Sequence, residues 1–186
     1  RSPIIDQNAP VFAPPDFERH VLRDYPIGHI TPYINMQMLL GHHLGLRGSV
    51  EQQLAAGETK AVQLKETGDQ ILLEAVTDGI IRTQAMYRFF PAQSSGNDIL
   101  IYYPAEPGKV LKRFSFPRQK VEPYLCLADF LKSVDSGQMD YVGFLVVTAG
   151  QGVRELSEKW KNEGEYLRSH VLQAVALELA EALAER

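Results

Sequence analysis

Three glutamates near the end of the chain have a spacing that could gather negative charge on one side of a helix. Glu178, Glu181 and Glu185 lie three and four residues apart, and side chains at these intervals share one helix face. Carboxylates on such a face could bind a cation or an amine. The competing interpretation is a helix face that meets only solvent, and the spacing alone favours this second interpretation.

The sequence offers little else for metal binding or nucleophilic chemistry. His42 and His43 are neighbours, so on a helix their side chains point about 100° apart and are badly placed to share one metal ion. No His-x-x-x-His or Cys-x-x-Cys pair is present, and we expect no metal site built from this chain alone. Cys126 has no flanking basic residue or histidine that would activate its thiol, which favours a buried cysteine over a nucleophile.

Two further motifs have simpler interpretations. The segment Ala149-Gly150-Gln151-Gly152 lies between a predicted strand and a predicted helix, where backbone amides could face an anion. Two glycines without a third glycine or a trailing acid favour a plain turn. Trp160 is expected to anchor packing, and no Gly-x-Ser-x-Gly elbow supports a serine nucleophile. We therefore expect no catalytic residue in this chain.

Composition limits the class of protein. The chain has 186 residues, of which 45% are hydrophobic and 23% charged, as in an ordinary globular domain. No apolar run approaches the roughly 20 residues that cross a bilayer. A net charge of −4 provides no general field for nucleic acid. A lone cysteine and the lack of a visible signal peptide favour a reducing cytoplasm.

The periodicity predicts an α+β fold in which helices bracket a mostly antiparallel, twisted sheet. The six prolines of the first 33 residues predict an extended arm or linker over residues 1–27, with a short helix near residues 16–24. A single domain is expected over residues 28–186. Its predicted helices cover residues 49–78, 125–134 and 153–186, and its predicted strands cover residues 83–90, 98–103, 109–115 and 139–148.

The long C-terminal helix and the last strand are expected to form the core. Leu172 and Leu179 recur at helical spacing, and Gly164 could divide the helix into two. Phe144 and Val146, in the apolar run of the last strand, are expected to be buried together with the two leucines. The helical pattern still runs at Arg186 with no stop signal. We therefore expect a fragment of a longer polypeptide, truncated at its C-terminal end.

Several segments in order resemble the activation domain of cobalamin-dependent methionine synthase, over about residues 28–186. An upstream match is Thr31-Pro32-Tyr33, with Leu39 and Gly41 at compatible spacing. The later matching segments are Phe90-Pro-Ala-Gln93, Asn97-Asp-Ile-Leu-Ile-Tyr102, Tyr124-Leu-Cys-Leu-Ala-Asp-Phe130, Asp140-Tyr-Val-Gly143, Val147-Thr-Ala-Gly150 and Leu179-Ala-Glu-Ala-Leu-Ala-Glu185.

The resemblance implies a methyltransferase module that repairs an oxidised cofactor. Such a domain binds S-adenosylmethionine and presents its methyl group to cobalamin, which a neighbouring domain of the same polypeptide holds. A flavodoxin-like protein supplies an electron, and the oxidised cob(II)alamin is remethylated. Cobalt and the reductant carry the hard chemistry while the protein positions the reactants.

The resemblance also implies four ligand-binding residues, namely His29, Pro32, Asp129 and Glu181. Glu181 matches a family glutamate near the ligand, whereas Asp129 could instead have a structural role and receive backbone amides. The family usually has an aspartate where this chain has His29, and an imidazole offers no negative charge when neutral. The family's Arg-x-x-x-Gly-Tyr-Pro segment would lie beyond Arg186. These two departures leave a rival hypothesis open, a non-catalytic docking or ligand-binding module of a corrinoid protein that keeps only the fold.

Overall fold

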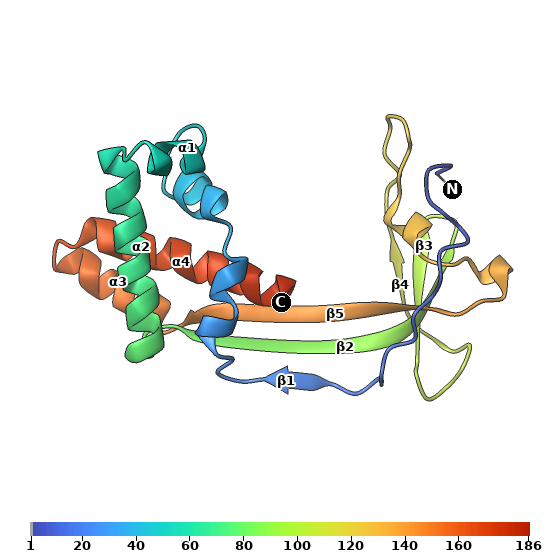
Figure 1. The fold of residues 1–186 in the computed structure, drawn as a ribbon. Coiled ribbons are helices and arrows are strands. Elements are labelled where there is room, and N and C mark those ends of the chain that lie inside the picture. Colours follow the sequence, from blue (N-terminus) through green and yellow to red (C-terminus); the bar gives the residue numbers. More distant parts are fainter. Residues whose placement is uncertain (1) are drawn as a thin grey trace. The chain divides into compact units, whose positions relative to one another are not determined.

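The computed structural model describes residues 2–186 and contains both helices and strands (Figure 1). The helices are α1 (Val50–Ala55), α2 (Thr59–Thr77), α3 (Val153–Asn162) and α4 (Tyr166–Glu185). The strands are β1 (His20–Leu22), β2 (Arg82–Ser95), β3 (Asp98–Tyr102), β4 (Val110–Ser115) and β5 (Asp140–Gln151). Short 3₁₀ turns cover Ile27–His29, Thr31–Tyr33, Leu127–Phe130 and Val134–Ser136, and Gln37–His43 is π-helical.

The chain forms two compact units. The sheet unit contains the described residues up to His20 together with Tyr87–Phe144. The helical unit contains Val21–Met86 and Leu145–Arg186. The α+β class is confirmed. The division into an arm of residues 1–27 and a domain of residues 28–186 stays a prediction.

The strands belong to one five-stranded sheet in the order β1-β2-β3-β4, with β5 also paired to β2. The pairs β2/β3 and β3/β4 are antiparallel, as the short connections predicted. Ser95 faces Asp98 at the end of the β2/β3 pair, so the connection is a two-residue loop. Gly96 in this loop has φ +63°, a conformation that glycine adopts without strain.

In the helical unit, α4 is the central element. Val171, Leu172, Val175 and Leu179 are completely buried on it. Helices α2 and α3, the 3₁₀ turn Thr31–Tyr33 and the π-helical segment Gln37–His43 all contact it. Figure 1 shows α2 (green) crossing α3 and α4 (orange to red). A helix that is apolar on most of its circumference needs partners on several sides, which explains this arrangement.

Polar side chains fasten α3 to α4. The two helices are separated at Gly164, whose φ of +88° suits a helix end, and the predicted division is confirmed. The Ser157 and Ser169 hydroxyls lie 2.8 Å apart, and the Gln173 amide donates to the Ser157 hydroxyl. Trp160 is buried, as predicted for a packing anchor, and the Arg168 guanidinium lies 4.1 Å from its ring centre.

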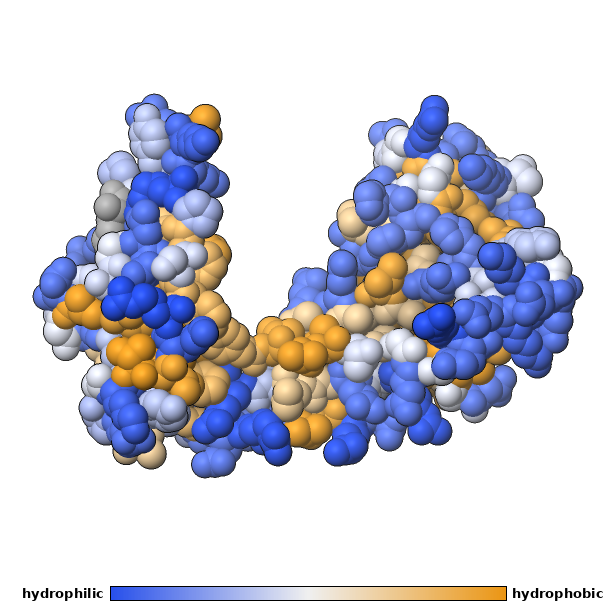
Figure 2. Space-filling model, turned by 180° about the vertical axis from the view of Figure 1, so that it is seen from behind, coloured by the Kyte–Doolittle hydropathy of each residue, from blue (hydrophilic) through white to orange (hydrophobic). Residues whose placement is uncertain are grey.

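The predicted burial of the last strand is wrong. β5 forms where it was expected, but Phe144 is 43% exposed, Leu145 54% and Val146 63%. Figure 2 shows apolar side chains along the surface of the strands. An apolar run of this length specifies a strand, but it does not specify whether either face of the sheet is covered. The predicted burial of Leu172 and Leu179 is confirmed.

Three local predictions also need correction. Residues 16–24 contain β1 and no helix, and the described residues before His20 form only turns and irregular structure. The helix expected at residues 125–134 is instead two single 3₁₀ turns. The helix expected at residues 49–78 is divided into α1 and α2, although Ser49 caps α1 by accepting from the Gln52 backbone N–H at 3.3 Å.

Among residues 2–186, no helix has both the length and the apolar character that a membrane crossing requires.

Replacing Leu179 with alanine tests the central position of α4. Leu179 is completely buried, so Leu179→Ala should lower the free energy of unfolding by about 2–5 kcal/mol. The control is Leu177→Ala on the same helix, because Leu177 is 56% exposed and should change stability by no more than about 0.5 kcal/mol. Urea denaturation followed by circular dichroism measures both. Equal losses in the free energy of unfolding for the two variants would contradict the burial of Leu179 and the exposure of Leu177 on α4.

Candidate functional site

Two of the predicted ligand residues lie on consecutive 3₁₀ turns of the helical unit. His29 ends the turn Ile27–His29 and is exposed, with its ring edge-on to Tyr25 at 6.1 Å between centroids. It lines an open groove of about 600 Å³ together with Tyr25, Arg82 and Thr83. This volume is within the range of small-molecule sites. Pro32 is exposed in the next turn, Thr31–Tyr33.

The third predicted ligand residue, Glu181, is exposed near the end of α4. The turn that contains Pro32 packs against α4. The fold therefore brings the turn with Pro32 to the helix with Glu181, although 149 positions separate these two residues in the sequence. The turn that contains His29 contacts α2 and the turn with Pro32. Glu185 is also exposed. The exposure of Glu181 and Glu185 therefore agrees with a helix face that meets only solvent.

Glu178 does not agree with that interpretation, since it is only 1% exposed. Its carboxylate Oε1 lies 3.0 Å from Nε2 of His43, a residue on the π-helical segment. The spacing of the glutamates and of the adjacent histidines did not predict this pair. The sequence did contain a signal for the burial of Glu178, because this residue falls at helical spacing among the apolar residues Val171, Val175 and Ala182, which are buried.

Burial is the main reason that the pKa of Glu178 is raised above its usual value, and the charge of Glu181 adds to this effect. Hydrogen bonds oppose the shift. They come from the His43 ring and from the backbone N–H of Asn35, two residues after the turn Thr31–Tyr33. Glu178 thus links α4 to both ends of the segment Asn35–His43.

The fourth predicted ligand residue, Asp129, lies in the sheet unit and is 1% exposed. Its oxygens accept from Arg118 at 2.6 and 2.8 Å, from the Cys126 backbone N–H at 3.1 Å and from the Ser2 backbone N–H at 3.3 Å. The hydrogen bonds from Arg118 are the largest of the effects that lower the pKa of this carboxyl to about 2. These contacts agree with the structural alternative for Asp129.

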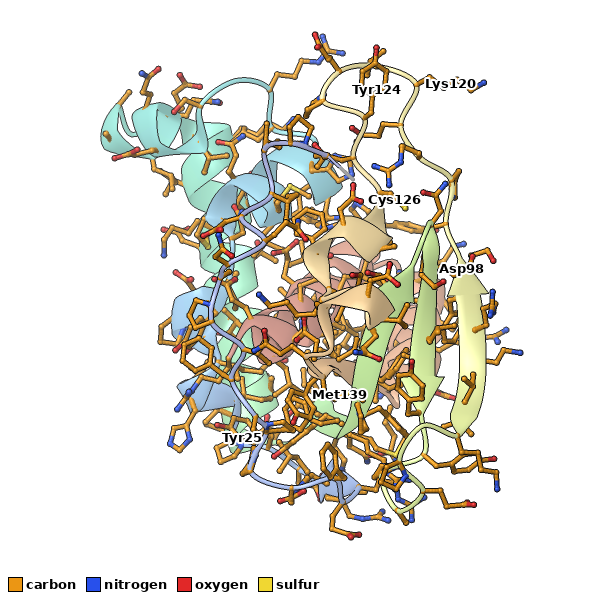
Figure 3. The ribbon with its side chains drawn as sticks, turned by 90° about the vertical axis from the view of Figure 1, so that its right-hand side faces the viewer. Tyr25, Asp98, Lys120, Tyr124, Cys126 and Met139 are labelled. Atoms are coloured by element: carbon orange, nitrogen blue, oxygen red, sulfur yellow. The ribbon has the colours of Figure 1, made fainter. Side chains whose placement is uncertain are left out.

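Arg118 also holds the loop that precedes Asp129. It donates to the Tyr124 carbonyl at 2.6 Å and to Asn97 Oδ1 at 3.0 Å. Tyr124 has φ +56°, a strained value for a residue with a side chain. Figure 3 shows Lys120 and Tyr124 at the outer end of this loop and Cys126 nearer to the sheet. Cys126 is buried, which confirms the prediction of a buried cysteine.

A second open groove of the helical unit, about 710 Å³, lies beside the turn after β5. Ala149 and Gly150 line it together with residues of α3 and α4, among them Arg154, Ser157 and Lys161. Arg154 pairs with Glu158, and Gly152 is the N-cap of α3. This geometry agrees with a plain strand-to-helix turn. Across residues 2–186, no group of three or more histidine, cysteine, aspartate or glutamate side chains is arranged to hold a metal ion.

Comparison with known proteins agrees with this architecture. The family described as "Vitamin B12 dependent methionine synthase, activation domain" matches residues 26–186. The methionine synthase of Mycobacterium tuberculosis (strain ATCC 25618 / H37Rv) is 30% identical over 185 residues, and that of Mycobacterium leprae (strain TN) is 28% identical over 183 residues. Each alignment covers 93% of this chain and 15% of the relative. The chain therefore spans a small part of the methionine synthases that it matches.

A solved structure has the same fold. It is described as "Crystal Structure of the MetH Reactivation Domain bound to AdoHcy" and superposes with a TM-score of 0.81 at 24% sequence identity. The match covers 91% of this chain and 53% of the solved chain.

The pairing of Asp129 with Arg118 predicts a specific pH dependence. Because the pKa of Asp129 is lowered to about 2 in the folded protein, its ionised form stabilises the fold above about pH 4, and this stabilisation is lost as the pH falls toward 2. The loss should amount to about 2 kcal/mol. Urea denaturation between pH 6 and pH 2 measures this loss. The free energy of unfolding of Asp129→Asn should fall by about 2 kcal/mol less over this range than that of the wild-type protein.

The matched control is Asp135→Asn, since Asp135 is exposed in the turn Val134–Ser136. Its pH dependence should follow that of the wild-type protein. Identical curves for Asp129→Asn and the wild-type protein would contradict the role assigned to this buried pair.

Proposed function

Because the chain belongs to the activation-domain family of vitamin B12-dependent methionine synthase, we propose that it binds S-adenosylmethionine for the reductive remethylation of oxidised cobalamin. In this proposal the chain is the reactivation module of a methyltransferase. The observation that carries the proposal is the packing of the turn Thr31–Tyr33 against α4. This packing joins the two segments on which the family resemblance implies ligand contacts.

The exposed residues of the helical unit suit the chemistry of this ligand. S-adenosylmethionine carries an ammonium, a carboxylate and a sulfonium, so it needs at least one partner that is negative or accepts hydrogen bonds. Glu181 supplies an exposed carboxylate, and His29 supplies an imidazole that accepts a hydrogen bond when neutral. Pro32 adds an apolar surface. Charge-assisted hydrogen bonds to Glu181 would hold the amino acid part of the ligand.

The role of the chain in this reaction is to orient the ligand. Cobalamin, which a neighbouring domain of the same polypeptide would hold, would supply the methyl acceptor. One electron from a flavodoxin-like donor would balance the transfer, and S-adenosylhomocysteine would leave. The chain itself needs no nucleophile or general base for this step, since it positions the sulfonium methyl and excludes wrong orientations.

We also propose that this reaction takes place in the cytoplasm. The support is Cys126, the single cysteine of the chain, which is a buried free thiol. Free thiols are usual in reducing compartments.

A non-catalytic docking or ligand-binding module is the second candidate. His29 favours it, because the family usually has a carboxylate at this position. The contacts of Asp129 favour it as well, because Arg118 and two backbone amides already occupy both oxygens of this predicted ligand residue. The two candidates differ in one measurable property, which is the affinity for S-adenosylmethionine.

Glu181→Gln tests the proposed ligand contact directly. In the full-length protein, the variant should bind S-adenosylmethionine about tenfold more weakly and reactivate oxidised cobalamin correspondingly less, because the ligand's ammonium loses its negatively charged partner and keeps only a neutral amide oxygen as acceptor. Isothermal titration calorimetry gives the affinity. The melting temperature should stay nearly unchanged, since Glu181 is exposed.

The control is Glu185→Gln, one turn further along α4 and also exposed. It should keep the wild-type affinity. If Glu181→Gln also keeps it, Glu181 belongs only to a solvated helix face. If the wild-type protein itself does not bind S-adenosylmethionine, the docking module is the better description.

His29→Asp tests the departure from the family at this position. The substitution restores the carboxylate that the family usually has, so it should strengthen S-adenosylmethionine binding by about tenfold. His29→Asn is the control, because it adds a side chain of similar size without the charge. Equal affinities of the two variants would contradict a role for negative charge at this position.

A further inference from the structure

Glu178 is a buried acid that the proposed function does not yet use. Burying a carboxylate costs free energy, and an apolar pair of similar volume often packs at least as stably as a buried ion pair. The neighbours of Glu178 on α4, Val175, Leu179 and Ala182, are all apolar and buried. Packing alone therefore gives no reason for a carboxylate here. Buried, electrostatically perturbed acids occur preferentially at functional sites.

The contacts of Glu178 connect it to both segments of the proposed site. Through His43 and the backbone of Asn35 it holds the segment that directly follows the turn containing Pro32. A second hydrogen bond joins the same elements, since Nε2 of His170 on α4 lies 3.2 Å from the His43 carbonyl. A ligand bound between Pro32 and Glu181 would lie against the elements that Glu178 fastens together.

The charge of Glu178 also reaches Glu181. The two residues are three positions apart on α4, where side chains are neighbours with about 5–6 Å between their β-carbons. Glu178 responds electrostatically to Glu181. No lysine or arginine of residues 2–186 forms an ion pair with Glu178, whose partner is His43. Because the carboxylate is withdrawn from water, its field is screened less by solvent and salt than that of a surface acid.

We infer that Glu178 is a specificity-determining residue, whose buried negative charge makes the site favour the cationic sulfonium of S-adenosylmethionine over the neutral thioether of S-adenosylhomocysteine. This inference rests on the proposed function. Glu181 contacts the amino group, which both ligands carry, and so it contributes to the binding of both. Glu178 acts at longer range on the charge by which the two ligands differ.

The test compares the two ligands in the full-length protein by isothermal titration calorimetry. The quantity of interest is the dissociation constant of S-adenosylhomocysteine divided by that of S-adenosylmethionine. Glu178→Gln keeps the shape of the side chain and an oxygen that accepts from His43, and it should lower this ratio by about three- to tenfold. A purely structural role would weaken both ligands equally and leave the ratio unchanged.

Two further variants make the result decisive. His170→Gln alters the other contact between the same elements without touching the carboxylate, and it should leave the ratio at the wild-type value. The double variant His43→Leu/Glu178→Met removes the charge together with its side-chain partner. It should lower the ratio as Glu178→Gln does, and it supplies the measurement if Glu178→Gln does not fold.

The outcomes separate this inference from the proposed function. If the wild-type protein binds both ligands and neither charge-removing variant changes the ratio, the specificity role of Glu178 is overturned while the proposed function stands. An equal fall of the ratio in His170→Gln would also overturn it. If the wild-type protein binds neither ligand, the proposed function fails, and the inference fails with it.

Discussion

The helical unit depends on the burial of α4. Val171, Leu172, Val175 and Leu179 have no exposed surface, and a helix that is apolar on several sides must be covered on each of them. Helices α2 and α3 cover part of it, and the turn Thr31–Tyr33 and the segment Gln37–His43 also contact it. The right-hand part of Figure 2 shows that the outer surface of this unit is mostly hydrophilic on that side. The same packing that stabilises the unit thus brings an early segment of the chain to the helix that carries Glu181.

Each unit contains a buried carboxylate, and the pKa values of the two carboxylates are shifted in opposite directions. Asp129 is bound by a guanidinium and two backbone amides, which stabilise its ionised form and lower its pKa. Glu178 has the imidazole of His43 as its side-chain partner, and burial raises the pKa of Glu178. The pair of Asp129 and Arg118 has a structural role, because it fixes the loop at Tyr124 and the backbone of Ser2. The arrangement around Glu178 leaves an acid sensitive to any charge that binds nearby, which is why Glu178 and not Asp129 is the better candidate for a functional role.

Local patterns in the sequence predicted most of the elements but not the environment of each side chain. Gly164 and the helical spacing of Leu172 and Leu179 predicted α3, α4 and the core position of α4 correctly. Phe144 and Val146 were assigned to the core wrongly, because apolar character specifies a strand but not whether its faces are covered. Glu178, Glu181 and Glu185 were predicted to share one helix face, although Glu178 also falls in line with the apolar residues Val171, Val175 and Ala182. Its partner His43 lies 135 residues earlier in the chain, and the local pattern does not identify such a distant contact. Of the predicted ligand residues, His29, Pro32 and Glu181 lie in the helical unit and Asp129 lies in the sheet unit.

Mapping where the ligand binds tests most directly whether the turn Thr31–Tyr33 and α4 together form the ligand site. Backbone amide chemical shifts, recorded by nuclear magnetic resonance while S-adenosylhomocysteine is added to the isotope-labelled protein, report this position without any substitution. We expect the largest shifts in residues 28–35 and in residues 178–184 near the end of α4. Shifts concentrated instead in residues 149–161, beside the groove that includes Gly150 and Lys161, would contradict this expectation.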